Sequence, residues 1–159
     1  MLILGIDPGI TGGFAVIESD GAFVTAEDLP IIRDGRLGWI DASAFTSRLI
    51  EIRGGRELRA TVERVHAMPL NGSQAAFSQG ATLGSILASL QVLRVPIELV
   101  QPATWKKSHG LSKDKSASLD RARLMFPSAD LDRKRDHNRA EALLIAEFSR
   151  RTFVGKAAA

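Results

Sequence analysis

Three acidic residues of this 159-residue chain lie in apolar segments, where an unpaired charge is costly. Asp7 directly follows the apolar run 2–6, which is typical of a buried strand. Glu63 lies near the end of a second such run, 58–65, and Glu141 borders the apolar face of a predicted helix. Because ligands gather at strand ends in mixed α/β sheets, we expect Asp7 and Glu63 to meet.

A divalent cation would relieve the repulsion among these carboxylates, which otherwise raises their pKa values. His137 precedes Glu141 by one helical turn and shares its side of a helix that reaches that far back. Carboxylate oxygens with one optional imidazole suit Mg²⁺ or Mn²⁺. Two such ions could activate a water and stabilise the leaving oxygen in phosphodiester hydrolysis. The alternative is that Asp7 only forms a turn and that Glu63 and Glu141 are solvated.

The last third of the chain is basic, although the formal net charge is only +3. A basic region in an otherwise balanced domain is typical of a protein that binds a polyanion. The alternative is a solvated surface with some ion pairs. The residues of this region are Lys106, Lys107, Lys113, Lys115, Arg121, Arg123, Arg133, Lys134, Arg135 and Arg139.

Length and composition predict one globular domain over 1–153, followed by a frayed tail over 154–159. The chain has no cysteine, which excludes a disulfide framework, a thiolate zinc site and a Cys nucleophile. No apolar run has the length of a membrane span, and no secretory signal precedes the first strand. We therefore expect a cytoplasmic protein with no membrane contact.

Apolar periodicity predicts strands that come first and then alternate with helices, which is typical of an α/β sandwich with a mixed sheet. The first three strands form an antiparallel meander, and 28–40 and 68–79 are predicted to be loops. The predicted strands are 2–7, 14–18, 22–27, 58–65 and 95–100, and the predicted helices are 41–53, 83–93, 102–105, 112–126 and a last helix from Asn138.

Three blocks of this sequence resemble the RuvC-type Holliday junction resolvases, in particular their short phage or prophage branch. They are "GIDPG" (5–9), "VERVHAMP" (62–69) and "AEALLIA" (140–146), in the expected order. The resemblance implies a ribonuclease-H-like fold, an α/β fold in which helices flank a mixed five-stranded sheet with an antiparallel meander followed by parallel strands. It further implies a homodimer and Mg²⁺-dependent paired nicking of a four-way DNA junction, in the host cytoplasm if the protein is phage-encoded.

The resemblance carries catalytic and metal-binding roles to Asp7, Glu63 and Glu141. A fourth ligand lies about one turn before the last acid in this family. Asn138 occupies that position and departs from the pattern, so His137 is the preferred fourth ligand and catalytic residue. Asp136 is the alternative, and it could serve only from a loop before the helix. The implied cofactor is Mg²⁺, as two ions, with Mn²⁺ as a substitute.

The resemblance also implies contacts with branched DNA. Lys113 and Lys115 in "SKDKS" match a basic segment that faces junction phosphates, and Lys106, Lys107 and Arg139 add to this surface. Such contacts give affinity without sequence readout. The side chains of His66, Met68 and Phe77 could stack on unpaired bases at the junction centre. The alternative is that Met68 and Phe77 belong to the core, and Trp105 is expected to be a packing residue.

Three other functions compete with a resolvase. An actin-like phosphate-binding domain shares the first hairpin, but it needs a second domain that this chain is too short to hold. A resolvase-like module that binds branched DNA without cutting it is the second. A nuclease of the same fold that acts on flaps, other branched DNA or RNA is the third.

Overall fold

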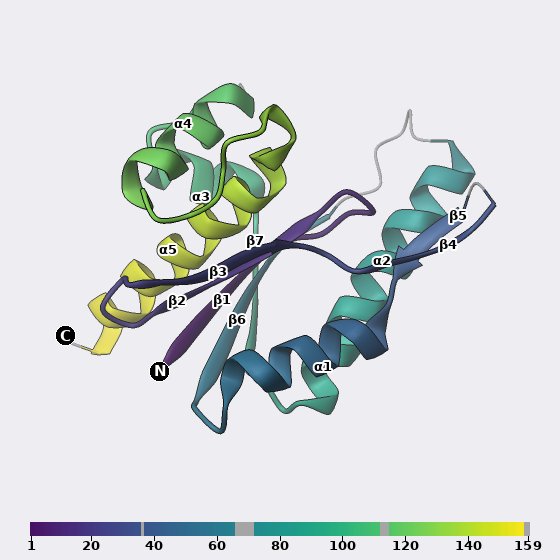
Figure 1. Cartoon of the computed structure of the whole chain (residues 1–159), viewed down its shortest axis with the longest axis horizontal. Coiled ribbons are helices and arrows are strands. Elements are labelled where there is room, and N and C mark those ends of the chain that lie inside the picture. The colour runs from purple at the N-terminus through teal and green to yellow at the C-terminus, as the bar shows by residue number, and fades with distance from the viewer. Residues whose placement is uncertain (36, 66–71, 112–114, 158–159) are drawn as a thin grey trace.

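The computed structural model describes residues 1–35, 37–65, 72–111 and 115–157 (Figure 1). Five strands form a mixed sheet in the order β3-β2-β1-β6-β7. Strand β1 pairs antiparallel with β2 and parallel with β6, β2 pairs antiparallel with β3, and β6 pairs parallel with β7. The predicted meander and the parallel strands are therefore confirmed. The strands are β1 (Leu2–Asp7), β2 (Gly13–Glu18), β3 (Phe23–Asp28), β6 (Leu58–Glu63) and β7 (Ile97–Val100).

Helices cover both faces of this sheet (Figure 1). One face carries α1 (Ala42–Arg53) and α2 (Ser73–Val92). The other face carries α5 (His137–Ala157), with α3 (Pro102–Ser108) and α4 (Lys115–Met125) packed beside it and the short 3-10 turn η1 (Lys134–Asp136) before it. Successive residues of β1 point to opposite faces.

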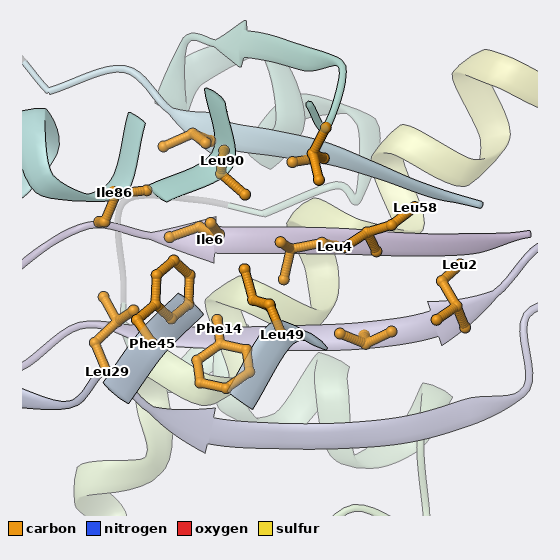
Figure 2. Close-up of a cluster of buried hydrophobic side chains, with 14 of the residues drawn as sticks. Leu2, Leu4, Ile6, Phe14, Leu29, Phe45, Leu49, Leu58, Ile86 and Leu90 are labelled. Carbon is orange, nitrogen blue, oxygen red and sulfur yellow. The ribbon is translucent and has the colours of Figure 1, made fainter. Parts of the chain in front are cut away.

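The alternation along β1 assigns its side chains to two separate cores. Leu2, Leu4 and Ile6 pack against Phe45 and Leu49 of α1 (Figure 2). Ile3 instead belongs to the core under α5. Asp7 continues the second set, so its carboxylate belongs to the α5 side of the sheet.

Gly5 allows α5 to lie directly on β1. A Cβ at this position would overlap the backbone oxygen of Ala142 and the backbone nitrogen of Ala146. The first glycine of "GIDPG" is therefore required for close packing of a strand on a helix, and this packing brings Asp7 and Glu141 to the same region.

The largest differences from the sequence prediction are at three places. The segment 28–40, predicted as a loop, contains a hairpin of β4 (Ile31–Asp34) and β5 (Leu37–Ile40). This hairpin is held against α2, where the Ser78 hydroxyl donates to the carbonyl of Gly38 at 3.0 Å. Helix α2 also starts at Ser73, inside the second predicted loop, and α5 continues past residue 154 to Ala157. Among the described helices, none is long and apolar enough to cross a membrane.

Candidate active site

Parallel pairing of β1 with β6 aligns two of the predicted acids at one edge of the sheet. The register pairs Ile6 with Val62, so Asp7 and Glu63 are the next residue on each strand. Val62 packs in the α1/α2 core, and Glu63 therefore faces the α5 side. Glu141 reaches the same edge from the second turn of α5.

One open pocket of about 530 Å³ collects these side chains. Asp7 and Glu63 line it from the strand ends, and Glu141 and Asn138 line it from α5. Lys106 of α3 completes this group. The rest of the wall comes from the turn after β1, the segment after β6 and helix α2, through Pro8, Gly9, Ile10, Thr11, Gly12, Arg64, Val65, Gln79 and Pro102.

Glu63 is held by Trp105. The Trp105 indole Nε1–H donates to Glu63 Oε2 at 2.7 Å. Burial raises the pKa of Glu63 above its usual value, the Trp105 hydrogen bond opposes this shift, and the negative charge of Glu141 adds to it. Glu141 therefore lies close enough to Glu63 to affect its pKa, which agrees with the pocket that both residues line.

Glu141 has a cationic partner inside the protein. Lys106 Nζ lies 2.9 Å from Glu141 Oε1, and the buried Ser118 hydroxyl donates to the same oxygen at 3.1 Å. Glu141 is only 6% exposed, whereas 22% of the Lys106 side chain is exposed, so water still reaches the pair from the lysine side. The positive partner that a buried carboxylate requires is thus supplied here by a lysine of the predicted basic region.

The donor chemistry of the pocket fits a hard divalent cation. Asp7, Glu63 and Glu141 offer carboxylate oxygens and Asn138 offers an amide, which are the ligand types that Mg²⁺ prefers. Within the described residues, however, no group of three or more acidic or histidine side chains is already arranged to hold an ion. The ammonium of Lys106 binds Oε1 of Glu141, so a metal that used this oxygen would have to displace it.

Among the three candidates for a fourth metal ligand, Asn138 is the one that lines this pocket. Its side-chain amide donates a hydrogen bond to the carbonyl of Thr11 in the turn after β1. His137 is the first residue of α5, and among the described lining residues neither it nor Asp136 appears. Asp136 is buried and bound by the backbone and guanidinium of Arg133, at 2.6 to 3.2 Å.

The predicted DNA contacts lie in different environments. Lys106 lines the pocket and Lys107 is exposed beside it on α3. Arg139 is bound by Asp28 through two hydrogen bonds of 2.6 and 2.8 Å. Phe77 is 71% exposed on α2, which excludes the alternative that it belongs to the core. Lys115 is the first residue of α4, and His66, Met68 and Lys113 lie outside the described residues.

The sequence did not predict the roles of three residues that line the pocket or bind its acids. Trp105 is fully buried, which confirms its predicted packing role, but it also binds Glu63. Ser118 supports Glu141 from α4, and Arg64 lines the pocket directly after Glu63. No local pattern signals the contacts of Trp105 and Ser118, because each joins segments that are far apart in the sequence.

No family model matches the chain. One relative, "Holliday junction resolvase MOC1, chloroplastic" of Chlamydomonas reinhardtii, is 36% identical over 92 residues, which are 55% of this chain. The chain spans about 10% of the length of that relative.

Two solved structures match almost the whole chain. The structure described as "T. thermophilus RuvC in complex with Holliday junction substrate" has a TM-score of 0.68 at 22% identity, and covers 98% of this chain and 96% of that one. A second Thermus thermophilus RuvC structure has a TM-score of 0.61 at 19% identity, covering 98% and 97%. Together with the mixed sheet, these matches confirm the expected likeness: the chain has the ribonuclease-H-like fold of RuvC.

Proposed function

We propose that this protein is a metal-dependent endonuclease that resolves four-way DNA junctions by paired symmetric nicks. The observation that carries the proposal is the convergence of Asp7, Glu63 and Glu141 on one open pocket of a RuvC-like fold. The relatives support the choice of substrate, since one is named a Holliday junction resolvase and another is a RuvC described in complex with a junction.

Asp7, Glu63 and Glu141 would hold Mg²⁺, with Asn138 or His137 as a fourth ligand and with Mn²⁺ as a substitute. Bound there, such ions would supply Lewis-acid chemistry, lowering the pKa of a water and offsetting negative charge on the leaving oxygen. Trp105 keeps the Glu63 carboxylate oriented, and Ser118 does the same for Glu141. The openness of the pocket admits a backbone phosphate, and the ammonium groups of α3 attract it.

Paired nicks require two sites in a fixed relation. A homodimer with two-fold symmetry would present one pocket to each of two symmetric strands of the junction. We therefore include a dimer in the proposal, with branched DNA as its partner.

The test is a nicking assay with Mg²⁺ on a synthetic four-way junction, beside a linear duplex and a flap. Symmetric nicks confined to the junction, lost in Asp7→Asn and retained in the exposed control Asp132→Asn, would support the proposal. Equal cutting of flaps or duplex would leave the nuclease and remove the junction selectivity.

One observation favours a second candidate, a module that binds junctions without cutting them. Lys106 holds Glu141, and the described residues present no ready-made group of metal ligands. Tight junction binding with no cleavage in either Mg²⁺ or Mn²⁺ would favour this module and overturn the enzyme.

A further inference from the structure

Arg64 lines the pocket directly after Glu63, whereas Lys106 lines it from α3. Its backbone N–H donates to the carbonyl of Val100 at 2.8 Å, which continues the β6–β7 ladder by one residue. Glu63 faces the α5 side, where Trp105 binds it. Strand alternation therefore directs Arg64 toward the α2 side, and Gln79 of α2 lines the same pocket.

The Arg64 side chain is exposed and available. Within the described part of the chain, no carboxylate forms an ion pair with it. Other arginines of this protein are engaged: Arg48 binds Glu27, and Arg139 binds Asp28. A guanidinium that lines an acidic pocket, and that pairs with none of the described carboxylates, is available to bind an anion from outside.

A phosphate that approaches this acidic pocket requires a cationic side chain to bind it. Three carboxylates line it, and they repel a phosphate backbone. Two cationic side chains line it among the described residues, and the ammonium of Lys106 is already paired with Glu141 at 2.9 Å. Arg64 is the remaining one, and the planar guanidinium matches two oxygens of a phosphate.

We propose that Arg64 is a positioning residue that binds a phosphate of the cut DNA strand, next to the phosphate that is hydrolysed and on the α2 side of it. The inference rests on the proposed function and assigns it a contact that no motif of the sequence identified. Arg64 acts by fixing where the strand lies over the three carboxylates.

The first test measures junction affinity in EDTA, where no cutting occurs, for Arg64→Gln and for the control Arg94→Gln. Arg94 is exposed in the turn before β7, at the opposite end of this strand from the pocket. We expect Arg64→Gln to weaken binding about tenfold and to reduce the salt slope by about one, as the loss of one charged phosphate contact predicts. Arg94→Gln should match the wild type, and Arg64→Lys should recover the salt slope with only part of the affinity.

The second test locates the phosphate. Junctions are prepared with one neutral methylphosphonate at a time on either side of the scissile phosphate. At one of these positions the methylphosphonate should weaken binding by the wild type about as much as the Arg64→Gln substitution does on unmodified DNA. At that same position, the methylphosphonate should cause no further loss of affinity in Arg64→Gln. Additive losses at every position would overturn the inference, because a purely structural effect of the substitution does not couple to one phosphate.

The behaviour of the wild type distinguishes failure of the Arg64 inference from failure of the proposed function. If it binds and nicks the junction while Arg64→Gln behaves as Arg94→Gln does, the inference about Arg64 fails and the proposed function stands. If the wild type neither binds nor nicks the junction, both fail.

Discussion

The two faces of the central sheet bury very different side chains. Under α1 and α2 the core is almost wholly apolar, built around residues such as Leu4, Phe45 and Leu49. The α5 side is also well packed, but its buried residues include Glu141 and Glu147. Buried charges cost stability unless they are paired, so their concentration on one face agrees with a proposed active site on this face. Further buried polar residues of the α5 side are Thr61, His109, Ser118, Asp136, Asn138 and Ser149.

Even within α5, the two buried acids have different surroundings. Glu147 is bound by the guanidinium groups of Arg150 and Arg151, each at 2.7 Å, with both partners on its own helix. Glu141 is held from two other elements, α3 and α4, and it opens on the pocket. We therefore expect Glu147 to be a structural acid and Glu141 to take part in the proposed reaction.

The largest expected effect separates these two acids. Glu141→Gln should reduce junction cleavage by about a thousandfold or more, since several kcal/mol of charge stabilisation is lost with a metal ligand. Glu147→Gln should cut at a rate near that of the wild type but unfold more easily, by about 1–3 kcal/mol, because its arginines lose their partner. Single-turnover nicking and urea denaturation check both. Equal loss of cleavage in the two variants would contradict the distinction.

A substitution in the α1/α2 core should instead lower stability and leave cleavage unchanged. Leu49→Ala removes a fully buried side chain of the α1/α2 core and should lower the free energy of unfolding by about 3 kcal/mol. Cleavage per folded molecule should be unchanged, because no described residue of α1 lines the pocket. Urea denaturation and nicking at a temperature where the variant stays folded give the two values.

Gly5→Ala should lower both the stability of the fold and the rate of cleavage. The added Cβ overlaps the backbone of α5, and relieving this overlap costs about 2–3 kcal/mol and moves the helix that carries Glu141. Gly35→Ala, in the turn of the exposed hairpin, provides a glycine control whose Cβ would meet no neighbour, although its φ of 57° adds local strain. Cleavage that survives in Gly5→Ala at full rate would show that the helix position is not critical.

The fold and the acids could be predicted from sequence because each has a local signal. Alternating apolar runs identified the meander, and an acid at the end of an apolar strand marked Asp7. The β4–β5 hairpin was missed because Gly35 and Gly38 suggested a loop, while its strands depend on contacts with α2. The roles of Trp105 and Ser118 have no local signal, since each arises only when α3 and α4 pack beside α5.

A change at Trp105 should shift the pH dependence of metal binding. Burial raises the pKa of Glu63, and the Trp105 hydrogen bond opposes this rise. Trp105→Phe removes that bond, so the pKa of Glu63 should rise further. Protons compete with a metal at this carboxylate, and affinity falls as the pH is lowered through its pKa. Mn²⁺ binding measured by calorimetry across pH should therefore weaken at a higher pH in the variant, and an unchanged profile would exclude Glu63 as a ligand.

The smallest expected effect concerns the lysine in the acidic pocket. Lys106 Nζ and a metal ion compete for Glu141, so removing the ammonium should favour the metal. Lys106→Met keeps most of the side-chain volume and should bind Mn²⁺ several-fold more tightly, since a partly exposed ion pair contributes about 1 kcal/mol. The same change should weaken junction binding, because Glu141 loses its neutralising partner and repels the phosphate backbone. Lys107→Met, one residue further on α3 and exposed, should leave Mn²⁺ affinity unchanged. If Lys106→Met binds Mn²⁺ no better than Lys107→Met does, the metal does not use the oxygen that Lys106 holds, and Glu141 contributes to the site through its other oxygen or through charge alone.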